Sequence, residues 1–390
     1  MSIDTEINEL NGQVNELLHM YGTWSNNFEY GAKAYDAYYK LVDFANFRME
    51  TVSSCLELIG NDKIADSFTL ERTLLENYLL FLLMCRGHKY FQVRSLKGKK
   101  PAEIEQILAD EQQYIGKGDL LEIRTYPKLD KHLMYIRKGV TIKGDPDYSI
   151  PFFNFVYGQF DPLTMRLDEK GYFTYFEPED DEDEQGDKLK KGQEQLHRQY
   201  LSYDALLQNL LLNEIVDDEA VRRIEAHYTF LSTYVHPTND AFRDLHKNSN
   251  EHSFKTMVGF DKPYKESTKL LASIYNAKIA VSIIKELIEA LKGGPSDFLQ
   301  NINSQEIESL CDAIESRNPF WFIFNDATNY DKFEQAVNIT PAEELNAIGG
   351  DYTKLSNEQV KFERDIMRRF EGSLGGWHNQ RVGRYQSPYN

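Results

Sequence analysis

Apolar residues recur at helical spacing along much of this chain. Near the start they alternate between steps of four and three, which predicts a helix with one apolar seam: Ile3, Ile7, Leu10, Val14 and Leu17. A longer seam of the same kind follows Pro263 and stops before the Gly-Gly-Pro at 293–295: Leu270, Ile274, Ala277, Val281, Ile284, Ile288 and Leu291. A seam of this length requires a partner helix, either in the same fold or in a second copy of the chain.

Two further patterns predict helices of the core. The first covers about 32–59, and Gly60 after it is expected to end it in the left-handed conformation. This helix is dense in aromatic residues: Tyr35, Tyr38, Tyr39, Phe44 and Phe47. The second begins near Asp66 or Ser67, either of which can cap it, and runs through 78–85. Because that stretch is apolar on nearly all sides, its helix is predicted to be central.

Three more helices are predicted toward the C-terminus. One extends from a cap at Asp217 or Asp218 to Pro237, which cannot continue a helix. Shorter helices are expected at 304–315 and 357–370. Together these patterns predict an all-α fold, a helical bundle.

The region 90–192 breaks this regularity and is predicted to be an insert or a small second lobe. Short helices are expected at 101–113 and 117–137. Apolar residues alternate on both sides of an Asp-Glu-Lys-Gly turn within 163–175, which predicts at most a small β-hairpin. The segment 177–187 carries eight acidic residues, whose repulsion predicts a solvated loop, and it lacks the ligand spacing of an EF-hand calcium site.

The predicted organisation is a bundle built from two separated parts of the chain. Residues 1–89 supply its first helices and residues 193–371 complete its core. Residues 90–192 form the irregular insert between them, and residues 372–390 form a basic and aromatic tail.

Composition excludes several classes of protein. With 41% hydrophobic and 13% aromatic residues, the chain can bury a large core and is not a disordered polymer. Its formal net charge of −18 has the wrong sign for coating nucleic acid or an anionic membrane with the whole surface. Any site for RNA must therefore be local.

The sequence carries no sign of secretion or of a membrane span. No secretory signal is visible at the N-terminus, and the longest apolar run is far shorter than a bilayer requires. The 3 cysteines are widely separated and odd in number, which fits a reducing compartment rather than a disulfide framework. We therefore expect a cytoplasmic protein without membrane association.

One constellation on two helices is the main candidate for chemistry. Arg72 and Glu76 are four residues apart on one helix, and Tyr228, Ser232 and His236 follow the same step on another. If the helices pack together, His236 can act as a general acid or base while Arg72 stabilises an anionic transition state. The other interpretation is a polar network that locks two core helices. Ser232 also has the side chain of a nucleophile, but a helix offers it no strained elbow and no oxyanion hole.

Motifs for cofactors and metals are missing from the sequence. It has no Gly-rich phosphate loop, no Gly-x-Ser-x-Gly elbow and no paired Cys-x-x-Cys. No cofactor and no metal are predicted.

The segments that carry the constellation resemble paired motifs of helical bacterial proteins loosely related to the HEPN superfamily. They are Arg-Thr-Leu-Leu-Glu at 72–76, followed by an apolar helix, and Tyr-Thr-Phe-Leu-Ser-Thr-Tyr-Val-His-Pro at 228–237. The resemblance implies a helical bundle that is often dimeric. It implies either a metal-independent ribonuclease of toxin–antitoxin or anti-phage systems, or an inactive binding module.

HEPN ribonucleases carry an Arg-x(4–6)-His signature, which this sequence matches at Arg222 and His227. Five residues turn Arg222 away from His227 around a helix, whereas Arg223 shares the face of the histidine. Glu225 inside the motif would repel phosphate. Arg222 and His227 are thus candidates for catalysis, for binding RNA phosphate without cutting it, or for an ordinary solvated helix face.

The C-terminal residues 361–390 contain more basic than acidic side chains, unlike the rest of the chain. Arginines and an aromatic residue interleave there in a way that suits stacking on single-stranded RNA and contact with its phosphates: Arg368, Arg369, Arg381, Arg384 and Trp377. The other interpretation is a tail that lies against the protein's own acidic surface.

Two functions of different classes follow from these observations. In the first, the chain is a HEPN-like cytoplasmic effector of bacterial defence or growth control that cuts RNA without a metal, using His236 or His227 with a nearby arginine. In the second, it is a non-catalytic helical module that recognises a protein partner, such as an antitoxin or a phage component. We also expect a homodimer through the helical seams.

Overall fold

The computed structural model describes most of the helices and short parts of the insert. The described residues are 2–28, 36–87, 89–95, 100–114, 121–124, 132–138, 155–156, 160–161, 166–167, 172–173, 203–236, 245–246, 263–294, 303–317, 329–356, 359–360 and 374. The acidic segment 177–187 and the tail 372–390, apart from residue 374, lie outside them.

The chain divides into two compact units. The first contains Met1–Tyr30, Val42–Tyr78 and Glu219–Asn390, and the second contains Gly31–Leu41 and Leu79–Asp218. The second unit begins before the expected insert 90–192 and ends after it. The domain limits at 89, 192 and 371 stay a prediction.

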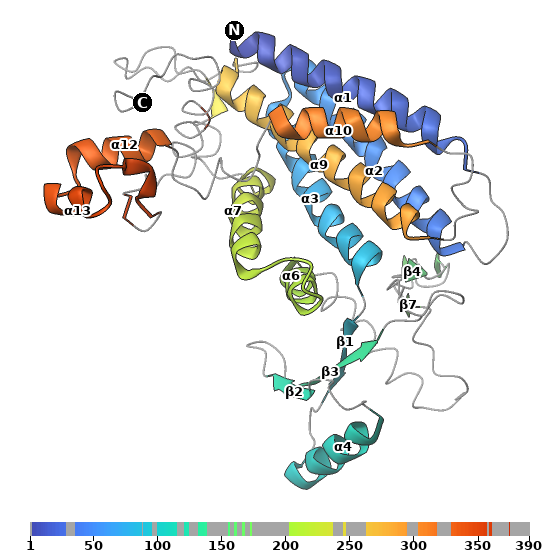
Figure 1. Ribbon diagram of the computed structural model, residues 1–390. Coiled ribbons are helices and arrows are strands. Elements are labelled where there is room, and N and C mark those ends of the chain that lie inside the picture. Colours follow the sequence, from blue (N-terminus) through green and yellow to red (C-terminus); the bar gives the residue numbers. More distant parts are fainter. Residues whose placement is uncertain are drawn as a thin grey trace. The chain divides into compact units, whose positions relative to one another are not determined.

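The two apolar seams of the first unit pack against each other. Helix α1 (Ile3–Ser25) lies along α9 (Glu266–Lys292), and α10 (Gln305–Arg317) contacts both, as Figure 1 shows. In the first seam every residue but Ile3 is buried. In the seam on α9 every residue is buried. The partner that the long seam requires is therefore within the same chain.

Helices α2 (Asp36–Gly60) and α3 (Ile64–Arg86) follow, joined by a tight turn. Gly60 is still helical, and the left-handed residue is Asp62, with φ 56°. The amide of Lys63 donates to the carbonyl of Leu58 at 2.8 Å, which satisfies a carbonyl at the helix end. The predicted end of the helix is thus confirmed to within one residue, whereas the left-handed conformation expected at Gly60 is wrong.

Helix α3 begins at Ile64, before both expected caps. Ser67 is fully buried inside it, and its hydroxyl donates to the Glu71 carboxyl instead of capping the helix. Ser67 lies inside the helix and does not bind the free amide groups of its first turn, so it cannot serve as the N-cap.

Helix α7 (Asp218–Val235) matches the predicted start and end. An aromatic cluster joins it to α3 and α9. The ring of Phe68 on α3 lies 5.6 Å from that of Phe230, 4.9 Å from that of Tyr234 and 6.2 Å from that of Tyr275 on α9. The two helices that carry the candidate residues are thus neighbours across about 150 intervening residues, because buried aromatic rings hold them together.

The described C-terminal part contains α12 (Asn329–Asn338), α13 (Ala342–Ala347) and the short η3 (Tyr352–Lys354). They share a small apolar cluster: Ala336, Tyr352, Leu355 and Val360, packed against Phe333, Leu345 and Ile348. The helix expected at 357–370 falls almost entirely outside the described residues, and its two described residues, 359–360, are not helical.

The second unit contains α4 (Pro101–Tyr114), α6 (Tyr203–Leu212) and a three-stranded antiparallel sheet. The sheet order is β1-β3-β2, with β1 at Lys89–Ser95, β2 at Leu121–Arg124 and β3 at His132–Lys138. The helix predicted at 101–113 is confirmed, but the helix predicted at 117–137 is wrong. All seven residues of β3 pair with β1, a distant strand that local spacing does not reveal.

Two short strand pairs also replace the predicted hairpin. Strand β4 (Phe155–Val156) pairs with β7 (Tyr172–Phe173), and β5 (Phe160–Asp161) pairs with β6 (Arg166–Leu167). The strands before and after the Asp-Glu-Lys-Gly turn therefore pair with earlier segments and not with each other. The all-α fold class is confirmed by the helical bundle, while the insert contains more strand pairing than a single hairpin.

Among the described helices, none combines the length and the apolar character needed to cross a membrane.

Candidate functional site

The candidate residues of α3 and α7 meet in one hydrogen-bonded cluster. Arg72 donates from Nε to Ser232 Oγ at 3.0 Å and from Nη2 to the hydroxyl of Tyr228. The Tyr228 hydroxyl donates to Glu76 Oε1 at 2.8 Å, and Arg72 Nη2 lies 3.3 Å from the same carboxylate oxygen. Four side chains predicted from spacing alone are thus brought together, and we call them the α3–α7 cluster.

The α3–α7 cluster is half-buried and charged. The side chain of Arg72 is 21% exposed and that of Glu76 is 30% exposed. The Arg72 guanidinium also lies 4.7 Å from the centre of the Tyr228 ring, within the range of a cation–π contact. Burial and the neighbouring Glu76 carboxylate raise the pKa of Tyr228, so its hydroxyl is a stable hydrogen-bond donor near neutral pH.

His236 follows Ser232 by four residues but takes no part in the hydrogen bonds that join the α3–α7 cluster. It follows the end of α7, and its backbone amide donates to the Ser232 carbonyl at 3.4 Å. Its side chain is exposed, and no described residue forms a hydrogen bond with the imidazole. The structure thus places an exposed histidine four residues after Ser232.

The structure separates the two residues of the Arg-x(4–6)-His match. Arg222 is exposed, whereas His227 is completely buried and its Nδ1 lies 2.8 Å from the hydroxyl of Tyr275. Burial, and the charge of Arg223, lower the pKa of His227 to about 3. Arg223 pairs with Glu219 at 2.5 Å. A sealed imidazole cannot reach RNA, so Arg222 and His227 do not form one site; the helical rotation between them is the reason.

A buried polar cluster at Glu71 was not predicted from the sequence. Glu71 is fully buried, Ser67 donates to its Oε1 at 2.8 Å, and its Oε2 accepts no hydrogen bond. Burial raises its pKa well above the usual value, which favours the protonated, uncharged form. Burial is also the main cause that raises the pKa values of Cys55 and Tyr275. The sequence signal was weak, because Glu71 precedes Arg72 on a helix that is apolar on most sides.

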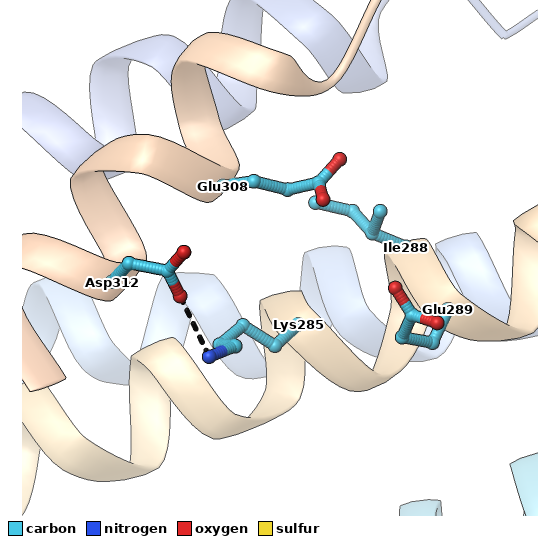
Figure 2. A pocket seen from close by; sticks show the side chains of 5 residues that line it. All are labelled: Lys285, Ile288, Glu289, Glu308 and Asp312. Atoms are coloured by element: carbon cyan, nitrogen blue, oxygen red, sulfur yellow. Dashed lines mark hydrogen bonds and ion pairs between the residues drawn. The ribbon is translucent and has the colours of Figure 1, made fainter.

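A pocket on the α9–α10 face is lined by Lys285, Ile288, Glu289, Glu308 and Asp312 (Figure 2). Lys285 donates to Asp312 at 2.8 Å across the two helices, as the dashed line shows. Further bonds join Lys285 to Glu315 at 2.7 Å and Lys292 to Glu308 at 2.7 Å. The charges of this pocket therefore pair with one another and fix α10 on α9.

The tail residues proposed for RNA lie outside the described residues: Arg368, Arg369, Arg381, Arg384 and Trp377. In the part of the chain that the structure describes, no group of three or more His, Cys, Asp or Glu side chains is arranged to hold a metal ion.

Comparison with protein-family models, curated proteins and solved structures found no match to this chain. The likeness to HEPN-related proteins therefore rests on the motifs at 72–76 and 228–237 alone.

Proposed function

We propose that this chain is a HEPN-like cytoplasmic effector of bacterial defence or growth control that binds RNA at the α3–α7 cluster and cuts it without a metal. The observation that carries the proposal is the position of Arg72. Its guanidinium is fixed by hydrogen bonds to Tyr228 and Ser232, its side chain is 21% exposed, and His236 follows Ser232 by one helical turn. A guanidinium held in this way is suited to a phosphate group.

In the proposed reaction the 2′-hydroxyl of RNA attacks the adjacent phosphorus. His236 accepts the proton of that hydroxyl, and Arg72 contacts the non-bridging oxygens as negative charge develops on them. The bond from phosphorus to the 5′-oxygen breaks, the protonated His236 returns a proton to the leaving oxygen, and the products are a 2′,3′-cyclic phosphate and a 5′-hydroxyl. Tyr228 and Ser232 act as positioning residues, because they hold the guanidinium in place.

The first test is RNA digestion by the purified protein in the presence of EDTA. We expect cutting that survives the chelator and yields 2′,3′-cyclic phosphate ends. His236→Ala should reduce the rate at least about a hundredfold, since general acid–base catalysis contributes that much. The melting temperature should stay within a few degrees, because the His236 side chain is exposed.

The matched control for this test is His19→Ala, another exposed histidine, on α1. It should leave the rate of cutting unchanged. Equal rates for the wild type and His236→Ala, or activity that EDTA abolishes, would contradict the proposed role of His236.

A second candidate function is a non-catalytic module that binds a protein partner. The position of Glu76 favours this second function. Its carboxylate lies 3.3 Å from the Arg72 guanidinium and neutralises the positive charge that a bound phosphate would require. The sealed position of His227 favours it as well. In this case the purified protein should leave RNA intact in the digestion test, and the contacts of Arg72 should contribute to folding stability alone.

A further inference from the structure

The guanidinium of Arg72 already has a carboxylate beside it. Glu76 Oε1 lies 3.3 Å from Arg72 Nη2 and accepts a hydrogen bond from the Tyr228 hydroxyl at 2.8 Å. Carboxylate oxygens and the non-bridging oxygens of a phosphate bind the same guanidinium donors. In this structure Glu76 therefore occupies a position on Arg72 that a phosphate oxygen would take.

The ion pair between Arg72 and Glu76 is one that a ligand can replace. The two side chains are 21% and 30% exposed, and ion pairs in contact with water contribute little to stability. The arginine also precedes the carboxylate by four residues, which is the weaker of the two orders on a helix. The Glu76 carboxylate can thus turn into solvent at small cost, whereas that of Glu71 is completely buried.

Arg72 has other contacts that keep it in place without Glu76. Its Nε donates to Ser232 Oγ at 3.0 Å, and its guanidinium carbon lies 4.7 Å from the centre of the Tyr228 ring. Both of these partners lie on α7, while Glu76 lies on α3 together with Arg72. Movement of the carboxylate therefore exposes the guanidinium without releasing it, and it leaves the Tyr228 hydroxyl able to donate to a ligand.

We propose that Glu76 is an internal competitor of the substrate: its carboxylate blocks Arg72, and a phosphodiester of an RNA strand binds there only by displacing it. This inference rests on the proposed function, which assigns the phosphate to Arg72. Because Glu76 belongs to the same helix, its carboxylate is present beside Arg72 at a high effective concentration. A lone anion therefore competes poorly, while an RNA strand with a second contact, at His236, can displace the carboxylate. Glu76 is thus a residue that determines specificity.

The test measures the binding of a 2′-O-methyl RNA oligonucleotide by fluorescence anisotropy. This probe cannot be cut, since it has no free 2′-hydroxyl. Glu76→Gln should lower its dissociation constant about tenfold, because the competing carboxylate and its repulsion of phosphate are both removed. In an Arg72→Met background the same substitution should have no effect, since Arg72 is the group that Glu76 blocks.

Glu219→Gln is the matched control, because Glu219 pairs with Arg223 at the same spacing on α7 and the change in net charge is identical. It should leave the dissociation constant unchanged, and the melting temperature of each variant verifies its folding. The proposal is overturned if Glu76→Gln binds no more tightly than the wild type. It is also overturned if Glu219→Gln has the same effect, or if the effect persists without Arg72.

Binding and cutting give separate answers. If Glu76→Gln binds the oligonucleotide more tightly but neither protein cuts unmodified RNA, the role of Glu76 stands and the ribonuclease activity fails. If the wild type cuts RNA in EDTA but Glu76→Gln binds no more tightly, the activity stands and the role of Glu76 fails.

Discussion

At the scale of single residues, the molecule contains two polar clusters with opposite surroundings. The α3–α7 cluster is half-exposed and combines a cation, a carboxylate and two hydroxyls. The cluster around Glu71 is sealed, and burial raises the pKa of this carboxyl well above its usual value. The two carboxylates differ because Glu76 has Arg72 as a counter-charge, whereas the described contacts of Glu71 include only a hydroxyl donor.

The contacts of Arg72 should be cooperative. Arg72→Met should destabilise the protein by about 1–3 kcal/mol, because it removes charge-assisted hydrogen bonds to Tyr228 and Ser232. Tyr228→Phe removes one of the same bonds. The double variant should therefore be more stable than additivity predicts, with a coupling energy of about 1 kcal/mol in urea unfolding. Additive effects would show that the two side chains act independently.

Glu71 should make stability decrease as pH rises. The pKa of Glu71 is higher in the folded protein than in the unfolded chain. The contribution of Glu71 to the free energy of unfolding is therefore complete below the unfolded pKa and is lost as the pH rises toward the folded pKa. Glu71→Gln keeps the shape and accepts the Ser67 hydrogen bond but cannot ionise. Relative to the wild type, the variant should gain stability between pH 5 and pH 9, measured by urea unfolding.

The matched comparison is Glu76→Gln, for a carboxylate that is 30% exposed and paired with Arg72. It should not show that gain. A wild type and a Glu71→Gln variant with parallel stability curves across the same pH range would mean that Glu71 ionises without cost.

At the scale of elements, apolar spacing was sufficient for the helices and insufficient for the strands. The seams of α1 and α9 and the limits of α7 were predictable, because burial of one stripe imposes a period on the sequence. Strand β3 was mistaken for a helix because its partner β1 is distant in the sequence. Phe47 was read as part of an aromatic core helix, yet it faces solvent, since composition alone does not assign a face.

The α3–α7 cluster was predictable for a related reason. Steps of four place Arg72 above Glu76 and Tyr228 above Ser232, so that only the contact between the helices remained to be assumed. Glu71 could not be assigned in the same way. It lies on a helix that is apolar on most sides, so the sequence does not indicate which face of the helix is buried.

The contact between α3, α7 and α9 should depend strongly on Phe68. This ring is fully buried and touches aromatic rings of both other helices: Phe230, Tyr234 and Tyr275. Phe68→Ala should cost about 3–5 kcal/mol of unfolding free energy, through lost burial and the cavity left behind. Urea unfolding measures this loss, and Val337→Ala on the surface should cost less than about 0.5 kcal/mol. Similar costs for both variants would contradict the central position of Phe68.

At the scale of the whole molecule, the net charge of −18 constrains every proposed partner. The proposed RNA site is small, with Arg72 and His236 acting within a field that repels phosphate at long range. The proposed RNA site therefore depends on short-range contacts rather than on long-range attraction.

The reactivity of the three cysteine thiols can report local opening of the helices that carry them. Cys55 on α2, Cys85 on α3 and Cys311 on α10 are all buried. Burial raises the pKa of Cys311 to about 12, so the reactive thiolate is scarce while α10 stays in place. Alkylation at each position thus requires that its own helix first open, and the three rates of modification rank the local stability of three helices in one intact molecule.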